Sequence, residues 1–311
     1  MSARNRLLRS PFVGACFCIV VLLFFVGTSF ADTLRGWTRI PDGSGMIDFV
    51  SINETTGQAT SLFQLPIPSG YEAATLTYNP LDGQFYGILH DNANGTQLFA
   101  TINPVSQSMT PLPFTGFPVG EIFEGLEYLQ GVGLVVSHGT TNATTKLSEV
   151  GPTGNLIPPS MPMPTIVDQD RLAANACGGK LHAFDTNHPT AGFTVNEWTD
   201  PFGSPSLTGV YNGPVDTNND YDAAIDPLTN TFYVTRYLSL WYYNLSPANT
   251  AVMVGNFNYP NGIAGIAAVN DCAAAIPTLT EWGMIIFALL LAGWMSFVVV
   301  KRWRRSHAMA A

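Results

Sequence analysis

The octapeptide NPLDGQFY at residues 79–86 recurs as DPLTNTFY at residues 226–233. Both copies place Asn or Asp before Pro, then Gly or Asn, then Phe-Tyr, which is typical of a tight turn that leads into a β-strand. The copies are 147 residues apart, or three times 49. A repeat of this length, built of strands and turns, predicts the blades of a β-propeller.

A second set of positions repeats with the same period. Each marks a strand followed by a turn rich in Pro, Asn or Gly, and successive members are 50, 48, 48 and 47 residues apart: Ile52, Ile102, Val150, Trp198 and Leu245. Two sets of positions thus repeat with one period, and the strands and turns between them favour propeller blades over a helical solenoid.

Each repeat begins with a strand of small and apolar residues, which suits the crowded position nearest a propeller axis. Four such strands are predicted, at residues 76–79, 125–129, 172–177 and 221–226. A fifth, at residues 263–269, stands alone, whereas the amino-terminal strands 34–40, 46–53 and 59–65 lack an inner strand. Joining the two ends makes one further blade and removes exposed sheet edges. The predicted fold is therefore all-β, a five-bladed propeller closed by N- and C-terminal strands, with six blades as the alternative.

The predicted ectodomain, residues 32–271, is strongly acidic. Residues 32–275 contain six basic and 21 acidic residues, a formal charge of −15, whereas the whole chain carries −9. Such a surface repels nucleic acid and attracts cations. Acidic excess also serves solubility, so the charge alone identifies no ligand.

The amino terminus has the pattern of an export signal. Arg4, Arg6 and Arg9 precede an uncharged stretch from residue 10 to residue 31. Residues 1–31 are therefore predicted to be a signal peptide that signal peptidase removes before Asp32. The apolar run is long for a signal core, so a retained membrane anchor is the alternative.

The carboxyl terminus combines a short motif, an apolar run and a basic end. Residues 272–283 form a linker that contains Ile276, Pro277, Thr278, Leu279, Trp282 and Gly283. Residues 284–300 are uncharged and predict a transmembrane helix, because about 20 apolar residues span a bilayer. The stop-transfer signal lies in the predicted cytoplasmic tail, residues 301–311, and consists of Lys301, Arg302, Arg304 and Arg305.

This segment resembles the IPTL-type C-terminal sorting signals of Gram-negative bacteria and matches every position of the motif. The resemblance covers about a tenth of the chain. It implies that exosortase, a membrane enzyme, processes the protein near the motif. The expected path is export, an inner-membrane-anchored precursor, and then the cell surface or the extracellular space. The resemblance implies nothing about the chemistry of the ectodomain.

Acidic residues near the starts of successive inner strands are candidates for a shared ligand site, with a second group expected near the ends of second strands. The first group is Glu72, Glu124, Asp170 and Asp222, and the second is His90, His138, Asp185 and Arg236. Carboxylates suit calcium, and imidazoles suit a transition metal. The alternative is that these residues only cap strands and solvate loops.

A second candidate calcium site is the loop that contains Asp216, Asn218 and Asp220. Its alternating oxygen side chains are typical of calcium loops. Tyr221 replaces the glycine of that pattern and Pro227 replaces its bidentate glutamate. A plain turn between blades is therefore the alternative. The sequence establishes no cofactor, and calcium is the leading candidate.

Two cysteines of the ectodomain region, Cys177 and Cys272, are candidates for a disulfide, which an exported protein can maintain. Both follow inner strands, so they are expected on the face from which the linker leaves for the membrane. The acidic face would then point outward. Free thiols are the alternative.

Three functional hypotheses follow. Nucleophile elbows, phosphate-binding glycine loops and zinc-protease motifs are not found in the sequence, which favours a non-catalytic surface or matrix module that binds an extracellular protein or polysaccharide. The alternatives are a metal-dependent extracellular glycosidase or lyase and a purely structural module. A pair of carboxyl groups about 5 to 9.5 Å apart in a cleft would favour the glycosidase.

Overall fold

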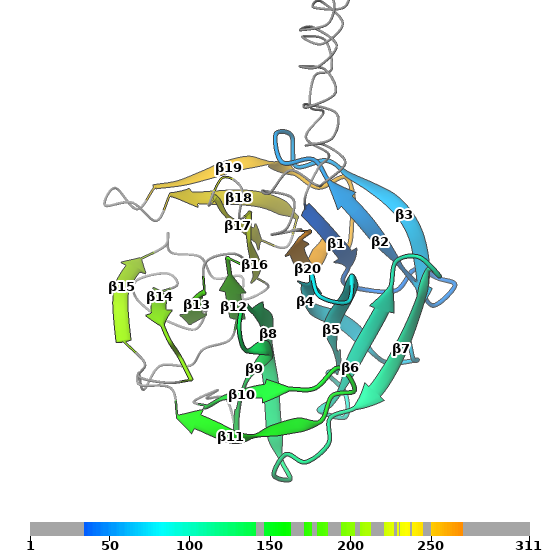
Figure 1. Cartoon of the computed structure of the whole chain (residues 1–311). Coiled ribbons are helices and arrows are strands. Elements are labelled where there is room, and N and C mark those ends of the chain that lie inside the picture. The colour runs from blue at the N-terminus through cyan, green and yellow to red at the C-terminus, as the bar shows by residue number, and fades with distance from the viewer. Residues whose placement is uncertain are drawn as a thin grey trace, which may run out of the picture.

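Twenty β-strands in the described part of the chain form five four-stranded antiparallel sheets arranged around an axis (Figure 1). The protein is represented by a computed structural model. It describes residues 34–140, 146–162, 171–175, 179–185, 194–202, 206–212, 221–226, 229, 231–236, 238–244 and 250–269. The predicted five-bladed propeller is confirmed.

The blades follow one another along the chain, each running from the axis to the rim. Blade 1 consists of β20 (Ile263–Ala268), β1 (Leu34–Thr38), β2 (Met46–Ile52) and β3 (Ala59–Pro66). Blade 2 consists of β4 (Glu72–Asn79), β5 (Gln84–Asp91), β6 (Thr96–Asn103) and β7 (Ser108–Pro113). Blade 3 consists of β8 (Glu121–Leu129), β9 (Gly133–Thr140), β10 (Lys146–Val150) and β11 (Leu156–Pro162).

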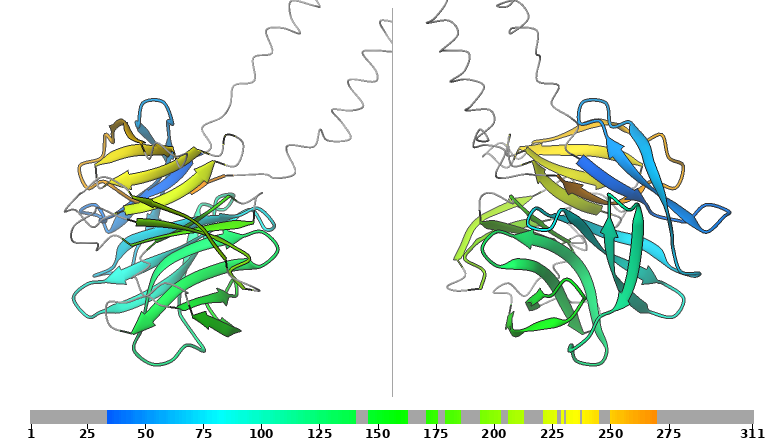
Figure 2. Two further views of the ribbon diagram at one scale, coloured as in Figure 1. Left: turned by 90° about the vertical axis from the view of Figure 1, so that its left-hand side faces the viewer. Right: turned by 45° about the vertical axis from the view of Figure 1, so that its right-hand side comes forward.

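The remaining two blades complete the ring. Blade 4 consists of β12 (Arg171–Ala174), β13 (Lys180–Asp185), β14 (Thr194–Thr199) and β15 (Ser206–Asn212). Blade 5 consists of β16 (Tyr221–Asp226), β17 (Thr231–Arg236), β18 (Ser239–Asn244) and β19 (Thr250–Asn256). The side views in Figure 2 show the twisted sheets side by side around the axis.

Blade 1 closes the ring in the way that the sequence predicts. Its inner strand β20 comes from the carboxyl-terminal end of the ectodomain and pairs with β1, with Gly36 opposite Ile266. Side chains also join blade 1 to blade 5, because the Gln58 amide donates to the carbonyl of Asn256 at 2.9 Å. Closure therefore leaves the inner edges of the sheets facing one another across the axis.

The repeated octapeptide forms the turn between the first two strands of blades 2 and 5. In blade 2 the Asn79 side chain accepts a hydrogen bond from the backbone N–H of Leu81 at 2.9 Å, and Gly83 has a positive φ of 71°. Phe85 and Phe232 occupy equivalent places in the two ladders, opposite Tyr78 and Ile225. The repeat in sequence is thus a repeat in backbone geometry.

Two inner strands begin earlier than predicted. The sequence predicts their starts at Leu76 and Gly125, whereas β4 starts at Glu72 and β8 at Glu121. In both strands the register shifts between the early residues and the rest, between Ala73 and Leu76 in β4 and between Phe123 and Leu126 in β8. A β-bulge interrupts the alternation of side chains, so the first residues of each strand do not read as strand in the sequence.

The hydrophobic core lies between neighbouring blades, whereas the axis is polar. The contact between blades 1 and 2 is filled by Trp37, Phe49 and Phe85, which are at most 3% exposed. Buried polar residues gather on the inner and second strands, among them Thr75, Thr77, Glu127, Asp222 and Thr235.

Several predicted features lie outside the described residues. These are the signal peptide, the calcium loop, the cysteine pair, the sorting motif, the transmembrane helix and the cytoplasmic tail. Within the described ranges, no helix is long and apolar enough to cross a membrane.

Candidate functional site

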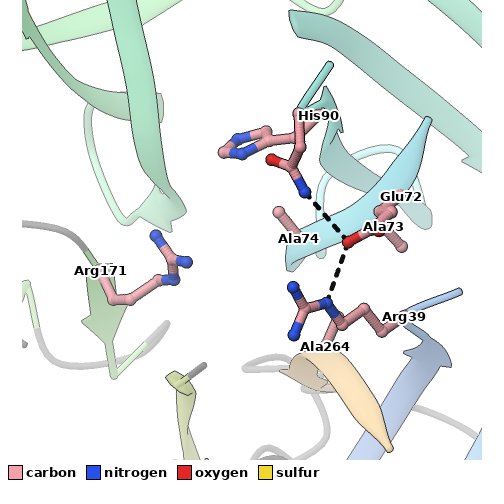
Figure 3. Close-up of a pocket in the computed structure, with 8 residues that line it drawn as sticks. Arg39, Glu72, Ala73, Ala74, His90, Arg171 and Ala264 are labelled. Atoms are coloured by element: carbon pink, nitrogen blue, oxygen red, sulfur yellow. Dashed lines mark hydrogen bonds and ion pairs between the residues drawn. The ribbon is translucent and has the colours of Figure 1, made fainter. Parts of the chain in front are cut away.

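A small polar pocket opens at the axis on the face where the inner strands begin, which we call the front face. It has a volume of about 100 Å³ and is lined by Arg39, Glu72, Ala73, Ala74, His90, Asn92, Arg171 and Ala264. These residues come from blades 1, 2 and 4 and their connections (Figure 3). We call this cavity the axial pocket.

Glu72 anchors one wall of the axial pocket. Its Oε2 atom accepts hydrogen bonds from Nε of Arg39 at 3.0 Å and from the side-chain amide of Asn92 at 3.2 Å (Figure 3). The Arg39 and Glu72 side chains are 25% and 28% exposed, so their ion pair is only partly shielded from water. Glu72 therefore brings a negative charge to a pocket that two arginines line.

His90 lies opposite Glu72 in the ladder between β4 and β5. Its Nε2 atom is 2.8 Å from the side-chain amide nitrogen of Gln97. Burial, together with the positive charges of Arg171 and Arg39, lowers the pKa of His90 to about 4. The imidazole is therefore neutral at pH 7.

Arg171 projects toward the pocket from the start of β12, on the side opposite Ala74 and His90 (Figure 3). One of its terminal nitrogens donates to the backbone carbonyl of Glu124 at 3.1 Å. Its charge acts both on His90 in the pocket and on Asp222 in the axis below. Arg171 is thus a cation held between the pocket and the polar axis.

Asp222 joins three inner strands at the axis and is 0% exposed. Its Oδ2 atom accepts hydrogen bonds from the backbone N–H groups of Leu76 in β4 and Ile266 in β20, at 3.1 and 2.8 Å. The hydroxyl of Thr75 lies 3.0 Å from Oδ1. Each inner strand has one edge whose backbone groups are not paired with another strand. The Asp222 carboxyl group accepts hydrogen bonds from backbone N–H groups on two of these edges, those of β4 and β20.

Glu127 has the same role between blades 2 and 3. Its Oε1 atom accepts hydrogen bonds from the hydroxyl of Thr77 at 2.6 Å and from the backbone N–H of Tyr128 at 2.8 Å. Burial raises the pKa of Glu127 to about 8, and the nearby Asp222 charge adds to the effect. Burial likewise raises the pKa of Asp222 to about 7.

The stability of the propeller should decrease as the pH rises from 6.5 to 8. The pKa values of Asp222 and Glu127 rise on folding, from 3.8 to about 7 and from 4.5 to about 8. Their contribution to stability is therefore full below pH 4 and is lost as the pH rises toward 8. Folding lowers the pKa of His90 and of His138 from 6.5, so their contribution increases with pH and opposes this trend until it is complete about one pH unit above 6.5.

Among the described groups whose pKa shifts, the two carboxyl groups dominate between pH 6.5 and 8, and the free energy of unfolding should fall by about 2 kcal/mol. Urea denaturation at several pH values measures this slope. The double variant Asp222→Asn, Glu127→Gln keeps the shape of both side chains and should show a flatter profile. An equally steep profile in that variant would assign the slope to other groups.

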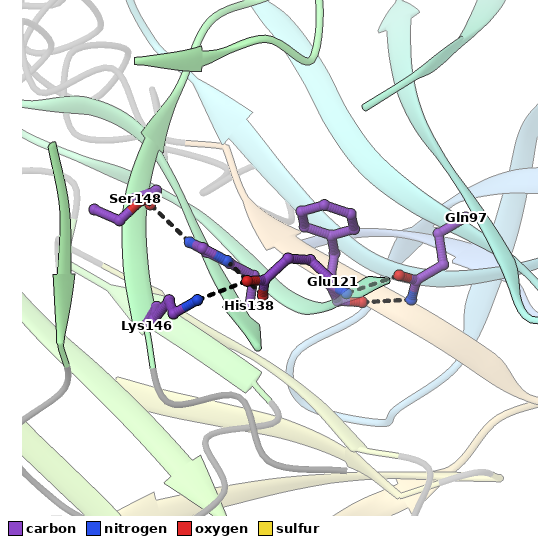
Figure 4. Close-up of polar contacts among 7 residues, drawn as sticks. Gln97, Glu121, His138, Lys146 and Ser148 are labelled. Atoms are coloured by element: carbon purple, nitrogen blue, oxygen red, sulfur yellow. Dashed lines mark hydrogen bonds and ion pairs between the residues drawn. The ribbon is translucent and has the colours of Figure 1, made fainter. Parts of the chain in front are cut away.

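His138 is bound within blade 3, away from the axial pocket. Its Nδ1 atom is 3.1 Å from Glu121 and its Nε2 atom is 2.7 Å from Ser148, while Lys146 donates to Glu121 at 2.6 Å (Figure 4). The order Ser, His, Glu has the form of a hydrolase triad. However, His138 and Ser148 are both 0% exposed, so a substrate does not reach the hydroxyl. The network links β8, β9 and β10.

The structure brings together only part of the predicted metal site. Glu72 and His90 share the axial pocket, whereas Asp222 is buried deeper in the axis and His138 is bound within blade 3. The backbone carbonyl of Glu124 accepts from Arg171. Arg236 packs over the Trp241 ring at 4.4 Å, and Asp185 ends β13.

Asp170 and the loop with Asp216, Asn218 and Asp220 lie outside the described residues. Among those described, no group of three His, Cys, Asp or Glu residues could hold a metal ion.

Sequence reasoning missed three residues that shape the axis: Arg39, Arg171 and Glu127. A signal for Glu127 was present, because it is the only charged residue in the predicted inner strand 125–129. Arg39 and Arg171 are two of only six basic residues in the ectodomain region, but nothing in their spacing shows that they converge.

Comparison with known proteins identifies the carboxyl-terminal segment. Residues 274–305 match the family model of the IPTL-CTERM motif. This confirms the predicted sorting signal, which indicates an exported, cell-surface-directed protein and makes exosortase-class enzymes its processing partners. No curated protein matches the chain.

The solved structures that match this chain are distant from it in sequence. A protein of unknown function from Bacteroides caccae is 13% identical, with 70% of this chain and 71% of that chain covered and a TM-score of 0.41. An α-L-arabinofuranosidase from Clostridium thermocellum is 11% identical, with 74% and 95% covered and a TM-score of 0.42. Hydrazine synthase from Kuenenia stuttgartiensis is 11% identical, with 71% and 80% covered and a TM-score of 0.38.

Proposed function

We propose that the propeller is a non-catalytic binding module at the cell surface, and that its axial pocket holds an anionic group of an extracellular polysaccharide. The observation that carries this proposal is the convergence of Arg39 and Arg171 on a pocket in which Glu72 is the one carboxylate among the described lining residues. The described lining residues thus carry a formal charge of +1 within an ectodomain region of charge −15.

The size of the pocket supports recognition of a substituent rather than of a whole sugar ring. Its volume of about 100 Å³ is well below the roughly 300 to 1,000 Å³ of pockets that enclose drug-sized ligands. A carboxylate group of a uronic acid is planar and matches the fork of guanidinium N–H donors. The neutral His90 and the amide of Asn92 supply further polar contacts around such a group.

Hydrolysis of the polysaccharide is less well supported. A glycosidase needs two carboxyl groups that face one cleft, one as acid and one as base or nucleophile. Glu72 is bound to Arg39 and Asn92, while Asp222 and Glu127 accept hydrogen bonds at the axis. Because of these hydrogen bonds, we assign structural roles to the carboxyl groups of Glu72, Asp222 and Glu127.

Export and anchoring are part of the same proposal. The predicted signal peptide, residues 1–31, would direct the chain across the inner membrane, and the predicted helix 284–300 would hold the precursor there until exosortase acts. Removal of residues 276–283 should then leave the chain in the membrane fraction. Cell fractionation with immunoblotting checks this, and release of the variant into the medium would contradict it.

Binding to a uronic acid polymer tests the function of the pocket. The purified full-length protein, in detergent, is titrated calorimetrically with polygalacturonate and with neutral dextran. The wild type should bind only polygalacturonate, and Arg171→Ala should weaken binding about 10- to 100-fold, because a hydrogen bond to a charged group contributes about 1.5 to 3 kcal/mol.

Arg236→Ala is the matched control. It removes the same charge from an arginine that stacks on Trp241 and does not line the axial pocket. An equal loss in both variants would indicate non-specific attraction, and equal binding of dextran would rule out the anionic group. Release of reducing ends from polygalacturonate would show that the protein hydrolyses the polymer, and the proposal of a non-catalytic module would then be wrong. If the wild type binds neither polymer, the proposed class of ligand is wrong.

A further inference from the structure

A second cavity lies on the opposite face of the propeller, where the inner strands end. It has a volume of about 390 Å³ and lies between blades 1 and 2. Its lining is mainly apolar and aromatic: Arg35, Phe49, Leu62, Phe63, Tyr78, Gly83, Phe85, Pro104, Gln107 and Val269. We call it the back-face groove.

The aromatic wall of the groove is built from two cross-strand pairs. Phe63 stacks on Phe49 with ring centroids 4.8 Å apart, and Tyr78 packs against Phe85 at 5.0 Å. Phe49 and Phe85 are buried in the contact between the blades, whereas Phe63 and Tyr78 are only partly buried. At the rim, Leu62 is 47% exposed and adds an accessible apolar side chain to the aromatic wall.

The position of Val269 indicates which part of the chain begins at the back-face groove. It follows β20 directly, lines the groove, and is the last residue that the structure describes. The chain therefore leaves the propeller from the wall of the groove. Ile276 follows seven residues later and Leu279 ten residues later. An extended chain covers about 3.3 Å per residue, so both side chains can reach any part of the groove.

We infer that the back-face groove is the docking site of the chain's own sorting segment, with Ile276, Pro277 and Leu279 packed against Phe63, Tyr78 and Leu62. The segment offers three apolar side chains within four residues, and the groove offers an apolar surface of matching character. Because a short linker joins the two, docking is intramolecular, with an effective concentration in the millimolar range. Even weak apolar contacts therefore suffice to occupy the groove.

Docking would control access to the sorting motif. Exosortase needs the motif in its own site, so the groove and the enzyme compete for the same residues. The folded propeller would thus hold the motif against its back face until the enzyme takes it up. An unfolded ectodomain would have no groove and would leave the motif unprotected.

Site-specific photo-crosslinking tests the contact in the full-length protein in detergent micelles. Leu62→benzoylphenylalanine places a photoreactive ketone at the rim, and mass spectrometry after irradiation locates its partner. The expected product is a crosslink within one chain to residues 270–283. The control is Val119→benzoylphenylalanine, which lies at a fully exposed position just before β8 on the front face and should not reach that segment. A crosslink between two copies, or none to residues 270–283, would overturn the inference.

Hydrogen exchange supplies a second and independent measurement. Leu62→Glu places a charge at the rim, at an exposed position where the fold should tolerate it. Amides of residues 270–279 should exchange at least tenfold faster in this variant than in the wild type, while those of blade 5 keep their rates. Equal exchange of residues 270–279 in both proteins would show that the groove does not hold the segment.

Discussion

Asp222→Ala should lower the free energy of unfolding by about 4 kcal/mol at pH 6. The substitution leaves the backbone N–H groups of Leu76 and Ile266 and the hydroxyl of Thr75 without their acceptor at the axis. Each buried group that loses its partner costs about 1 to 3 kcal/mol, and entry of water offsets part of the total. Urea denaturation followed by circular dichroism measures the loss.

Asp222→Asn is the matched control. Its amide oxygen can accept both backbone hydrogen bonds, so this variant should lose about 1 kcal/mol or less. The comparison isolates the hydrogen bonds, because the pKa of Asp222 is raised to about 7 and its carboxyl group is mostly neutral at pH 6, as the asparagine amide is. If alanine is tolerated as well as asparagine, the strands at the axis do not depend on the Asp222 acceptor.

Gly87→Ala should cost about 3 kcal/mol, because β5 leaves no space for a methyl group. A Cβ atom at Gly87 would overlap the indole ring of Trp37 and lie 2.8 Å from the carbonyl oxygen of Thr75. Trp37 is 0% exposed and donates to the carbonyl of Ala74 at 3.3 Å, so its ring cannot move freely. Overpacking of this kind costs about 1 to 3 kcal/mol, and contact with backbone places this case at the upper end.

A thermal melt should show the effect as a decrease in Tm of about 6 to 12 °C for a domain of this size. Gly43→Ala is the control, since a Cβ at Gly43 meets nothing within 4 Å. The double variant Gly87→Ala, Trp37→Leu should lose much less stability than the two single variants predict together, because the smaller side chain vacates the space that the methyl group needs. Additive losses would show that the two sites do not compete for space.

The sequence was sufficient to predict the blades and their closure. Turn residues are local signals: Asn79 and Gly83 form their turn with contacts that span only a few residues, and the same pattern recurs at Asp226. The repeat period of about 49 residues then predicts the number of blades. The lone inner strand 263–269 and the incomplete amino-terminal set implied the pairing of β20 with β1, because an open ring leaves edges exposed. The sorting signal could likewise be predicted from the sequence, since its motif is contiguous in the chain.

The candidate site was predicted less well, because its residues come from different blades. Glu72 and His90 lie together because they are cross-strand partners in one blade. Asp222 was expected near a ligand face, but the inner strands converge and bury it among backbone donors. Arg39 and Arg171 are 132 residues apart, and only closure of the ring brings them to one pocket.

The sequence by itself thus determined the features that depend on neighbouring residues or on a regular period: the strands, the turns, the number of blades and the sorting signal. The tertiary structure alone decided which side chains face the axis, which carboxyl groups lose their water, and which charges remain in the axial pocket. The physical reason is that burial and electrostatic interaction depend on distances through space. Those distances are set by how five separate sheets pack around one axis.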